Sequence, residues 1–274
     1  MSSPLLARAE RFRALHQGPG AFVIANAWDG ASTRILESLG FEAIATSSGA
    51  AAATRGRLDG QLTREEALAH SRLIAGATSR PVSADLEGGF GDAPEVVAET
   101  VRLAAEAGLV GCSIEDSTRD PARPLYDIGL ATERIAAASE AARALPFPFT
   151  LTARSENFLH GRSDLDDTIR RLLAFERAGA DVLFAPGLPD LESVRAVCSV
   201  VAKPVNFMAG IRGKSFTIAE LAAAGVKRVS LATSLYRAAL TGLLTAAREV
   251  REAGTFTYLE HILASPELNA LLTS

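Results

Sequence analysis

The chain has 274 residues, of which 48% are hydrophobic and 22% charged, and its net charge at pH 7 is −4. This composition excludes an intrinsically disordered chain and disfavours nucleic acid as a partner, since phosphate binding needs a basic surface. Two cysteines, Cys112 and Cys198, are too few for a disulfide framework or a CxxC zinc site. We find neither a signal peptide nor a run of about 20 apolar residues, and therefore expect a soluble, cytoplasmic protein without membrane contact.

Short β-branched runs alternate with helical stretches along the whole chain. Segments such as Pro94–Ala107 repeat apolar residues with the period of a helix. Four helical stretches end in a glycine just before a strand, in ESLGFEAIAT, EAGLVGCSIE, RAGADVLFA and AAGVKRVSLA, as is typical of a helix carboxyl terminus. In chain order, the predicted strands are Phe22–Ala25, Ala43–Thr46, Val82–Asp85, Cys112–Glu115, Phe149–Ala153, Val182–Phe184, Pro204–Asn206 and Arg228–Leu231.

Eight strands that alternate with helices over about 250 residues predict an α/β fold of the (β/α)8 barrel type. The alternative is an open, doubly wound sheet, but no GxGxxG follows the first strand and no linker divides the chain. We therefore expect a single barrel domain over residues 1–274, with residues 241–274 forming a helical extension at the carboxyl terminus.

Four carboxylates follow the predicted strands at the end where a barrel gathers its active site. Asp85 and Glu87 end the third strand, Glu115 ends the fourth, and Asp59 lies in the loop after the second. Because side chains alternate along a strand, Asp85 and Glu87 are expected to share one face. Crowded carboxylates raise one another's pKa unless a cation lies among them, and oxygen ligands suit Mg²⁺ or Mn²⁺. The alternative is that each acid is a surface charge or a helix cap.

The chain resembles the isocitrate lyase/phosphoenolpyruvate mutase superfamily over a series of short segments. They are Ser48-Gly49, Asp59, SADLEGGFGD (83–92), SIED (113–116), LTAR (151–154) and VNFM (205–208), in that order. The resemblance implies a barrel whose last helix swaps between the subunits of a homodimer or homotetramer. It also implies Mg²⁺ and the making or breaking of C–C or P–C bonds beside a 2-oxo acid, through an enolate.

The resemblance also implies individual roles. Asp85 would bind the metal directly, and Asp59, Glu87 and Glu115 would hold metal-bound waters. Arg154 would pair with an anionic group, so that Arg154, Glu115 and Asp59 are the expected catalytic residues. The expected substrate contacts are Ser48, Gly49, Ala50, Asp85, Arg154 and Asn206, of which Asn206 would lie in the distal part of the pocket.

The loop after SIED departs from the superfamily. Isocitrate and methylisocitrate lyases carry a K-[KR]-C-G-H motif there, and phosphonomutases carry Lys and Asn, but this loop reads STRDPARPLYDIG (117–129). Pro186 stands where lyases have an acid after the sixth strand. Cys112 lies inside a predicted strand with parity opposite to Glu115, so it does not replace the missing cysteine. The loop does offer Arg119, Asp120, Arg123, Tyr126 and Asp127, and His160 follows the fifth strand, whereas His16, His70 and His261 are expected on surface helices.

These observations favour a Mg²⁺-dependent lyase or decarboxylase that acts on a 2-oxo or 2-hydroxy di- or tricarboxylate, and argue against an authentic isocitrate or methylisocitrate lyase. One alternative is P–C bond chemistry on phosphonopyruvate. Another is a protein that binds 2-oxo acids without turning them over.

Overall fold

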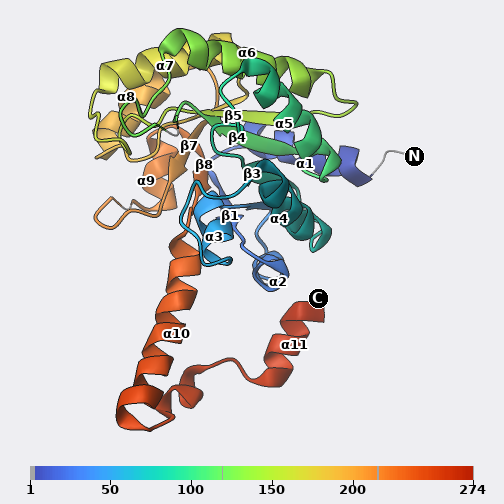
Figure 1. The fold of residues 1–274 in the computed structure, drawn as a ribbon, viewed down its shortest axis with the longest axis vertical. Coiled ribbons are helices and arrows are strands. Elements are labelled where there is room, and N and C mark those ends of the chain that lie inside the picture. Colours follow the sequence, from blue (N-terminus) through green and yellow to red (C-terminus); the bar gives the residue numbers. More distant parts are fainter. Residues whose placement is uncertain (1–3, 119, 215, 274) are drawn as a thin grey trace.

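The computed structural model describes residues 4–118, 120–214 and 216–273, and within these ranges eight parallel strands close into a barrel in chain order (Figure 1). The predicted barrel is therefore confirmed. The strands are β1 (Phe22–Asn26), β2 (Ala43–Ala45), β3 (Val82–Asp85), β4 (Gly111–Glu115), β5 (Thr150–Arg154), β6 (Val182–Phe184), β7 (Val205–Met208) and β8 (Val226–Ser230). Each overlaps its predicted counterpart, with ends that differ by at most two residues.

Helices surround the barrel and connect its strands. They are α1 (Pro4–Gln17), α2 (Gly30–Ser38), α3 (Ser48–Ala53), α4 (Arg64–Gly76), α5 (Pro94–Glu106), α6 (Ile128–Arg143), α7 (Leu165–Arg177), α8 (Leu191–Val200), α9 (Ile218–Ala223), α10 (Ser234–Ala253), the 3₁₀ helix η1 (Thr257–His261) and α11 (Ser265–Thr273). The glycines expected after four of them, Gly40, Gly108, Gly179 and Gly225, have φ between +87° and +102°. This left-handed conformation carries no steric penalty for glycine, so the chain can turn from helix into strand.

The two faces of the barrel wall differ in chemistry. Residues such as Ile114, Leu151 and Leu183 are buried in the main apolar core, which also includes side chains of the surrounding helices. Their neighbours of opposite parity, among them Thr152 and Asn206, are polar and also buried. The inside of this barrel therefore carries buried polar side chains, and some of them, such as Asn206, line the carboxyl-end site.

Helix α1 packs at the amino end of the barrel, with Phe12 fully buried against Ile24 and Val110. His16 is 7% exposed and His70 8% exposed, so the expectation that both lie on the surface is wrong. Each ring donates a hydrogen bond to a backbone carbonyl, of Phe12 and of Trp28 respectively, at 2.8 Å. That bond satisfies one nitrogen and lets a neutral imidazole enter the interior.

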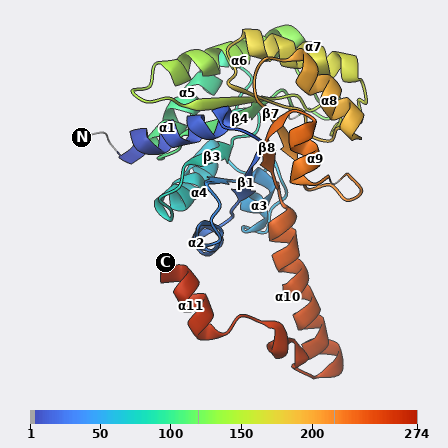
Figure 2. The ribbon, with the colours of Figure 1, turned by 180° about the vertical axis from the view of Figure 1, so that it is seen from behind.

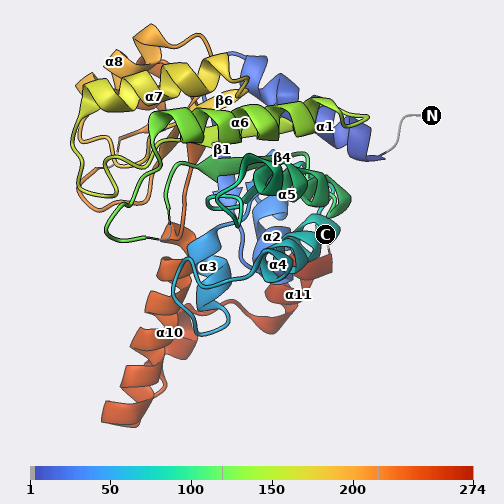
Figure 3. The same ribbon diagram turned by 45° about the horizontal axis from the view of Figure 1, so that its top comes forward.

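The carboxyl-terminal segment leaves the barrel as an arm of α10, η1 and α11 (Figures 1 and 2). Helix α10 begins at Ser234, so the predicted start of the extension near residue 241 falls inside a continuous helix. None of the described residues of α10, η1 or α11 is buried, and α11 returns to contact α2 (Figure 3). Within the described ranges, no helix has the length and apolar character needed to cross a bilayer.

Candidate active site

Two adjoining cavities open at the carboxyl end of the barrel. The inner cavity, of about 290 Å³, reaches into the barrel, and the outer cavity, of about 700 Å³, lies under the loop after β4. Ser48, Asp59 and Arg154 line both. The structure therefore gathers most of the predicted site: Asp85 and Asn206 line the inner cavity, and Glu87 and Glu115 line the outer one.

Two predicted contacts belong to helix α3 rather than to a cavity wall. A side chain on Gly49 would meet Asp59, since a Cβ built there lies 3.1 Å from Asp59 Oδ2. Ala50 is buried, lines neither cavity among the described residues, and donates its N–H to Ser47 Oγ at 3.4 Å. Ser47 is thus the N-cap of α3. Its hydroxyl oxygen accepts a hydrogen bond from the Ala50 N–H group, although Ala50 was expected to contact the substrate.

Asp85 is held in place at the end of β3. Its Oδ2 accepts hydrogen bonds from the Ser48 hydroxyl at 2.9 Å and the Ser48 N–H at 3.3 Å. The Ser113 hydroxyl approaches Oδ1 at 3.5 Å, and the Asp85 N–H donates to Thr46 Oγ1 at 3.0 Å. These contacts come from α3, from β4 and from Thr46 just after β2, so three segments hold Asp85 in place.

Arg154 lies among three carboxylates. Its Nη1 is 3.4 Å from Glu115 Oε2 and 3.7 Å from Asp85 Oδ1, and its Nε donates to Glu156. Burial lowers the pKa of Arg154, but Glu156, Glu115 and Asp85 outweigh that effect and raise it. The guanidinium therefore pairs with carboxylates of the chain itself, and an anionic substrate would have to share Arg154 with them.

The carboxylates around Arg154 outnumber this single positive charge, and burial together with the excess of negative charge raises the pKa of two acids of the site, Glu115 and Asp59. Burial raises the pKa of Glu115 well above its usual value, and the charges of Glu156, Asp85 and Glu87 add to the effect against the opposing Arg154. Loss of hydration also raises the pKa of Asp59, with the charge of Asp85 as the second cause. A cation placed among these groups would relieve both.

The geometry fits a largely hydrated cation. In the described part of the chain, no three His, Cys, Asp or Glu side chains stand close enough together to chelate a metal directly. Mg²⁺ commonly takes one or two carboxylates and keeps several waters. Asp85 could therefore hold Mg²⁺ directly while Asp59, Glu87 and Glu115 accept hydrogen bonds from its waters.

Glu87 lies in a strained turn after β3, with φ of +49°, and Phe90 in the same turn has φ of +65°. Positive φ in non-glycine residues is costly and clusters at functional sites. The alternation of side chains expected along β3 therefore ends at Asp85, and the turn rather than the strand orients Glu87. A Cβ at Gly91 would lie 2.6 Å from Val96 Cγ1, so any larger residue there would force Val96 to shift.

Arg134 on α6 holds this turn and was not predicted. Its guanidinium donates to the carbonyl groups of Gly88, Gly91 and Asp92 and lies 4.1 Å from the centre of the Tyr126 ring. The signal was present in the sequence, because Arg134 falls on the apolar face of its helix beside Ile135.

Asp116 and Arg171 form a buried pair beneath the site, at 3.0 Å between Oδ2 and Nη1. Asp116 also accepts the Glu156 N–H at 2.8 Å, and Arg171 donates to the Tyr126 carbonyl at 2.9 Å. Burial raises the pKa of Asp116 to about 6. The pair ties the ends of β4 and β5 to the loop and to α7, so it positions the site without lining either cavity.

The loop after β4 presents few polar groups to the outer cavity. Tyr126 lines the cavity and donates its hydroxyl to Asp92 at 2.6 Å, and Ser117 lies 2.9 Å from His160 Nε2. Arg123 is exposed and pairs with Asp120 at 3.3 Å, and Asp127 is the N-cap of α6. Arg119 lies outside the described residues.

Neither cysteine lines the described part of either cavity. Cys112 is fully buried, and burial raises the pKa of its thiol. Burial also raises the pKa of the half-buried Cys198, to about 11. Both thiols are thus protonated near neutral pH, which suits packing rather than catalysis.

Comparison with known proteins gives a consistent result. A family model for phosphoenolpyruvate phosphomutase matches residues 12–251. A crystal structure from Burkholderia cenocepacia J2315, of a protein assigned as a lyase or mutase, is 52% identical and covers 99% of this chain and 98% of its own, with a TM-score of 0.97.

Two curated relatives carry names that specify a reaction. An oxaloacetate decarboxylase from Bradyrhizobium diazoefficiens is 32% identical over 72% of this chain and 69% of its own length. A probable 2-methylisocitrate lyase from Corynebacterium glutamicum is also 32% identical, over 72% of this chain and 67% of its own. The chain therefore belongs to the phosphoenolpyruvate phosphomutase family, within the isocitrate lyase/phosphoenolpyruvate mutase superfamily of lyases and mutases.

Proposed function

We propose that this enzyme is a Mg²⁺-dependent lyase that decarboxylates or cleaves a 2-oxo or 2-hydroxy dicarboxylate, with oxaloacetate as the leading substrate. The cluster of Asp59, Asp85, Glu87 and Glu115 around Arg154 supports a metal-assisted reaction on an anionic substrate. The relative named oxaloacetate decarboxylase supports the choice of substrate. The proposal also includes a cytoplasmic location, which rests on the sequence alone.

The observation that carries the proposal is the composition of the loop after β4. The relatives named for oxaloacetate and for methylisocitrate are equally similar to this chain, so overall identity does not decide between them. Residues 117–129 contain no Cys, Lys or His. Carbon dioxide leaves without a proton from the enzyme, whereas a carbanionic leaving group such as that of methylisocitrate needs a positioned acid.

The proposed reaction assigns a task to each part of the site. In oxaloacetate the bond between C3 and the departing carboxylate breaks, its electron pair forms the enolate of pyruvate, and C3 then takes a proton from solvent. Arg154 would hold a substrate carboxylate, and Ser48, which lines both cavities, would contact the oxo acid. Bound Mg²⁺ would supply positive charge beside the oxygen on which the enolate charge develops.

The test compares substrates on one purified preparation. With Mg²⁺ present, oxaloacetate should give pyruvate and CO₂ at a rate well above that of an equal amount of the Asp85→Ala variant. That variant is the appropriate blank, because free Mg²⁺ also promotes decarboxylation of oxaloacetate. Equal rates for the two proteins, with efficient turnover of phosphonopyruvate instead, would replace the proposal with P–C bond chemistry. Saturable ligand binding without turnover of either compound would identify a binding protein.

We also propose that the arm of α10, η1 and α11 packs on a second copy of the chain in a homodimer or homotetramer. The arm is a helical extension of one barrel domain. It exposes large apolar side chains that a monomer would leave in water. They include Leu240, Leu243, Leu244, Val250, Phe256, Leu259, Ile262 and Leu263.

A further inference from the structure

We infer that the floor of the inner cavity is an anion subsite built on Arg228, which takes either a carboxylate group of the substrate or a small inorganic anion. The identification of the anion as a carboxylate of the substrate rests on the proposed function, whereas the existence of the subsite does not. Nothing in the superfamily resemblance assigned a role to this residue, which lies in the middle of a strand rather than at its end.

Arg228 faces into the barrel one layer below the site. It lies two residues before Ser230, the last residue of β8, and it is opposite Asn206 in the register with β7. Two residues of a strand span about 7 Å, so a substrate held at Asp85 could extend down to it. Arg228, Asn206 and Asp85 all line the inner cavity, which therefore connects the two levels.

The hydrogen-bond partners of Arg228 are neutral. Its Nε donates to Asn206 Oδ1 at 2.8 Å, its Nη2 donates to Thr152 Oγ1 at 2.9 Å, and its Nη1 lies 3.4 Å from His16 Nε2. A guanidinium has five N–H groups. These contacts engage three of them, so one N–H on each Nη remains available among the described residues.

Three other arginines with little exposure show how this chain ordinarily compensates such a charge. Arg154 has three carboxylate neighbours, and Arg171 pairs with Asp116 and Asp167. Arg134 is surrounded by three backbone carbonyls. Arg228 is 5% exposed and has no ion pair with any described Asp or Glu. Among the residues that the structure describes, it is thus a buried cation without a counter-charge.

Burial of an unpaired charge is costly, and an anion in the same cavity would offset that cost. Burial lowers the pKa of Arg228 to about 9, which still leaves it charged at neutral pH. Asn206 reinforces the arrangement. Because Arg228 only donates, the Asn206 oxygen must face it, and the amide nitrogen turns to Ser230 Oγ at 3.0 Å. The cavity floor therefore presents N–H groups.

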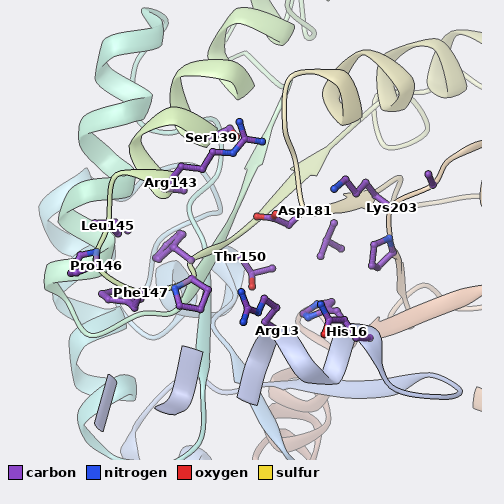
Figure 4. Close-up of a pocket in the computed structure, with 17 residues that line it drawn as sticks. Arg13, His16, Ser139, Arg143, Leu145, Pro146, Phe147, Thr150, Asp181 and Lys203 are labelled. Atoms are coloured by element: carbon purple, nitrogen blue, oxygen red, sulfur yellow. The ribbon is translucent and has the colours of Figure 1, made fainter. Parts of the chain in front are cut away.

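The amino end of the barrel does not supply the missing negative charge. A third cavity, of about 720 Å³, lies there, and His16 and Thr150 are on its wall (Figure 4). Its acid, Asp181, accepts the Leu151 N–H at 2.9 Å and interacts with Lys203 and Arg143 rather than with Arg228. Arg13 adds a further positive charge on that side. The compensating anion is therefore expected from the carboxyl-end cavity.

The experiment follows thermal unfolding of the full chain while oxalate with Mg²⁺, or sodium chloride alone, is titrated. Arg228→Met removes the charge and keeps a long side chain, and Arg228→Lys keeps the charge. Thr152→Val is the matched control, because it removes one contact of Arg228 and leaves the charge in place. Calorimetry of Mg²⁺ alone checks that the metal site is intact in each variant.

We expect oxalate to raise the unfolding temperature of the unsubstituted protein and of Thr152→Val. Arg228→Met should lose at least tenfold in oxalate affinity, keep its Mg²⁺ affinity, and unfold at the same or a higher temperature without ligand. An effect confined to oxalate identifies the substrate carboxylate as the anion, and an equal effect of chloride identifies an inorganic one.

Oxalate affinity within twofold of the unsubstituted value in Arg228→Met would overturn the subsite. A large fall in its ligand-free unfolding temperature would do the same, because it would show that Arg228 supports the barrel by itself. Absence of oxaloacetate turnover alongside Arg228-dependent anion binding would refute the proposed function and leave the subsite standing.

Discussion

His16 on α1 and Arg228 on β8 meet inside the barrel, with 3.4 Å between the ring Nε2 and the guanidinium Nη1. The His16 Nδ1–H donates to the Phe12 carbonyl, so Nε2 is the acceptor and the ring is neutral. Burial, followed by the charge of Arg228, lowers the pKa of His16 to about 3. The contact forms only while the imidazole stays unprotonated.

This contact predicts acid-sensitive stability. Between pH 6.5 and about 3 the unfolded chain binds a proton at His16 that the folded chain does not, so stability falls as the pH drops through that window. From pH 7.5 to 5 the loss at this site is about 2 kcal/mol. Chemical unfolding of His16→Gln at pH 7.5 and at pH 5 should show a loss of unfolding free energy that is smaller by that amount than the loss in the unsubstituted protein. His261→Gln, at an exposed histidine, is the control; a pH dependence in His16→Gln equal to that of the unsubstituted protein would contradict the assignment.

The metal assignment predicts unequal effects of two carboxylates. Asp85→Ala should abolish Mg²⁺-dependent binding of oxalate, because Asp85 is the proposed direct ligand. Glu115→Gln should only weaken it, since the amide can still contact a metal-bound water. Titration calorimetry measures both, with Glu133→Gln on the exposed side of α6 as a control for the loss of one negative charge. Unchanged affinity in Asp85→Ala would rule out this metal site.

The cysteines should be dispensable for turnover. Cys112→Ser and Cys198→Ser are each expected to retain most of the activity on the substrate identified, because both thiols are protonated and lie away from the cavities. Cys112→Ala is the companion variant, because a hydroxyl in that fully buried position could lower stability by itself. Substrate-protected inactivation by a thiol reagent that maps to Cys112 is the result that would overturn this prediction.

The loop should limit the range of substrates. A missing general acid costs roughly 10²–10⁴-fold in rate, so cleavage of isocitrate or methylisocitrate should be negligible beside Mg²⁺-dependent decarboxylation of oxaloacetate. Glyoxylate and pyruvate release are measured with coupled assays under identical conditions. Efficient glyoxylate release from isocitrate would show that a loop residue supplies the proton, and the loss of that activity in Tyr126→Phe would identify it.

The apolar arm should control assembly. Replacing both Leu243 and Leu244 by Glu places charge on an apolar region of α10, where the two side chains are 65% and 49% exposed. Light scattering after size exclusion should then give a smaller mass than for the unsubstituted protein. Replacing Arg248 by Glu on the same helix reverses one charge, which changes the net charge as much as the two leucine replacements do without removing a leucine, and it should leave the mass unchanged. The same mass for all three proteins would show that the arm makes no subunit contact through these leucines.

Local signals in the sequence were enough to predict the barrel and the end of it at which the site lies. Strand alternation, helix spacing and the terminal glycines such as Gly40 and Gly225 are local signals, and local physics sets them. Asp85, Glu115 and Arg154 could be placed because parallel strands bring their carboxyl ends together whatever the detailed packing. The family resemblance supplied their expected roles.

The partners that compensate each buried charge could be identified only from the folded structure. His16 and His70 lie in helices whose sequence does not show which face is covered, and only packing revealed that both are buried. The Asp116–Arg171 pair joins residues 55 positions apart, and the His16–Arg228 contact joins residues 212 apart. Electrostatic interactions depend on distance in space and on burial rather than on separation in sequence. For this reason the paired site around Arg154 and the unpaired cation at Arg228 became visible only in the folded chain.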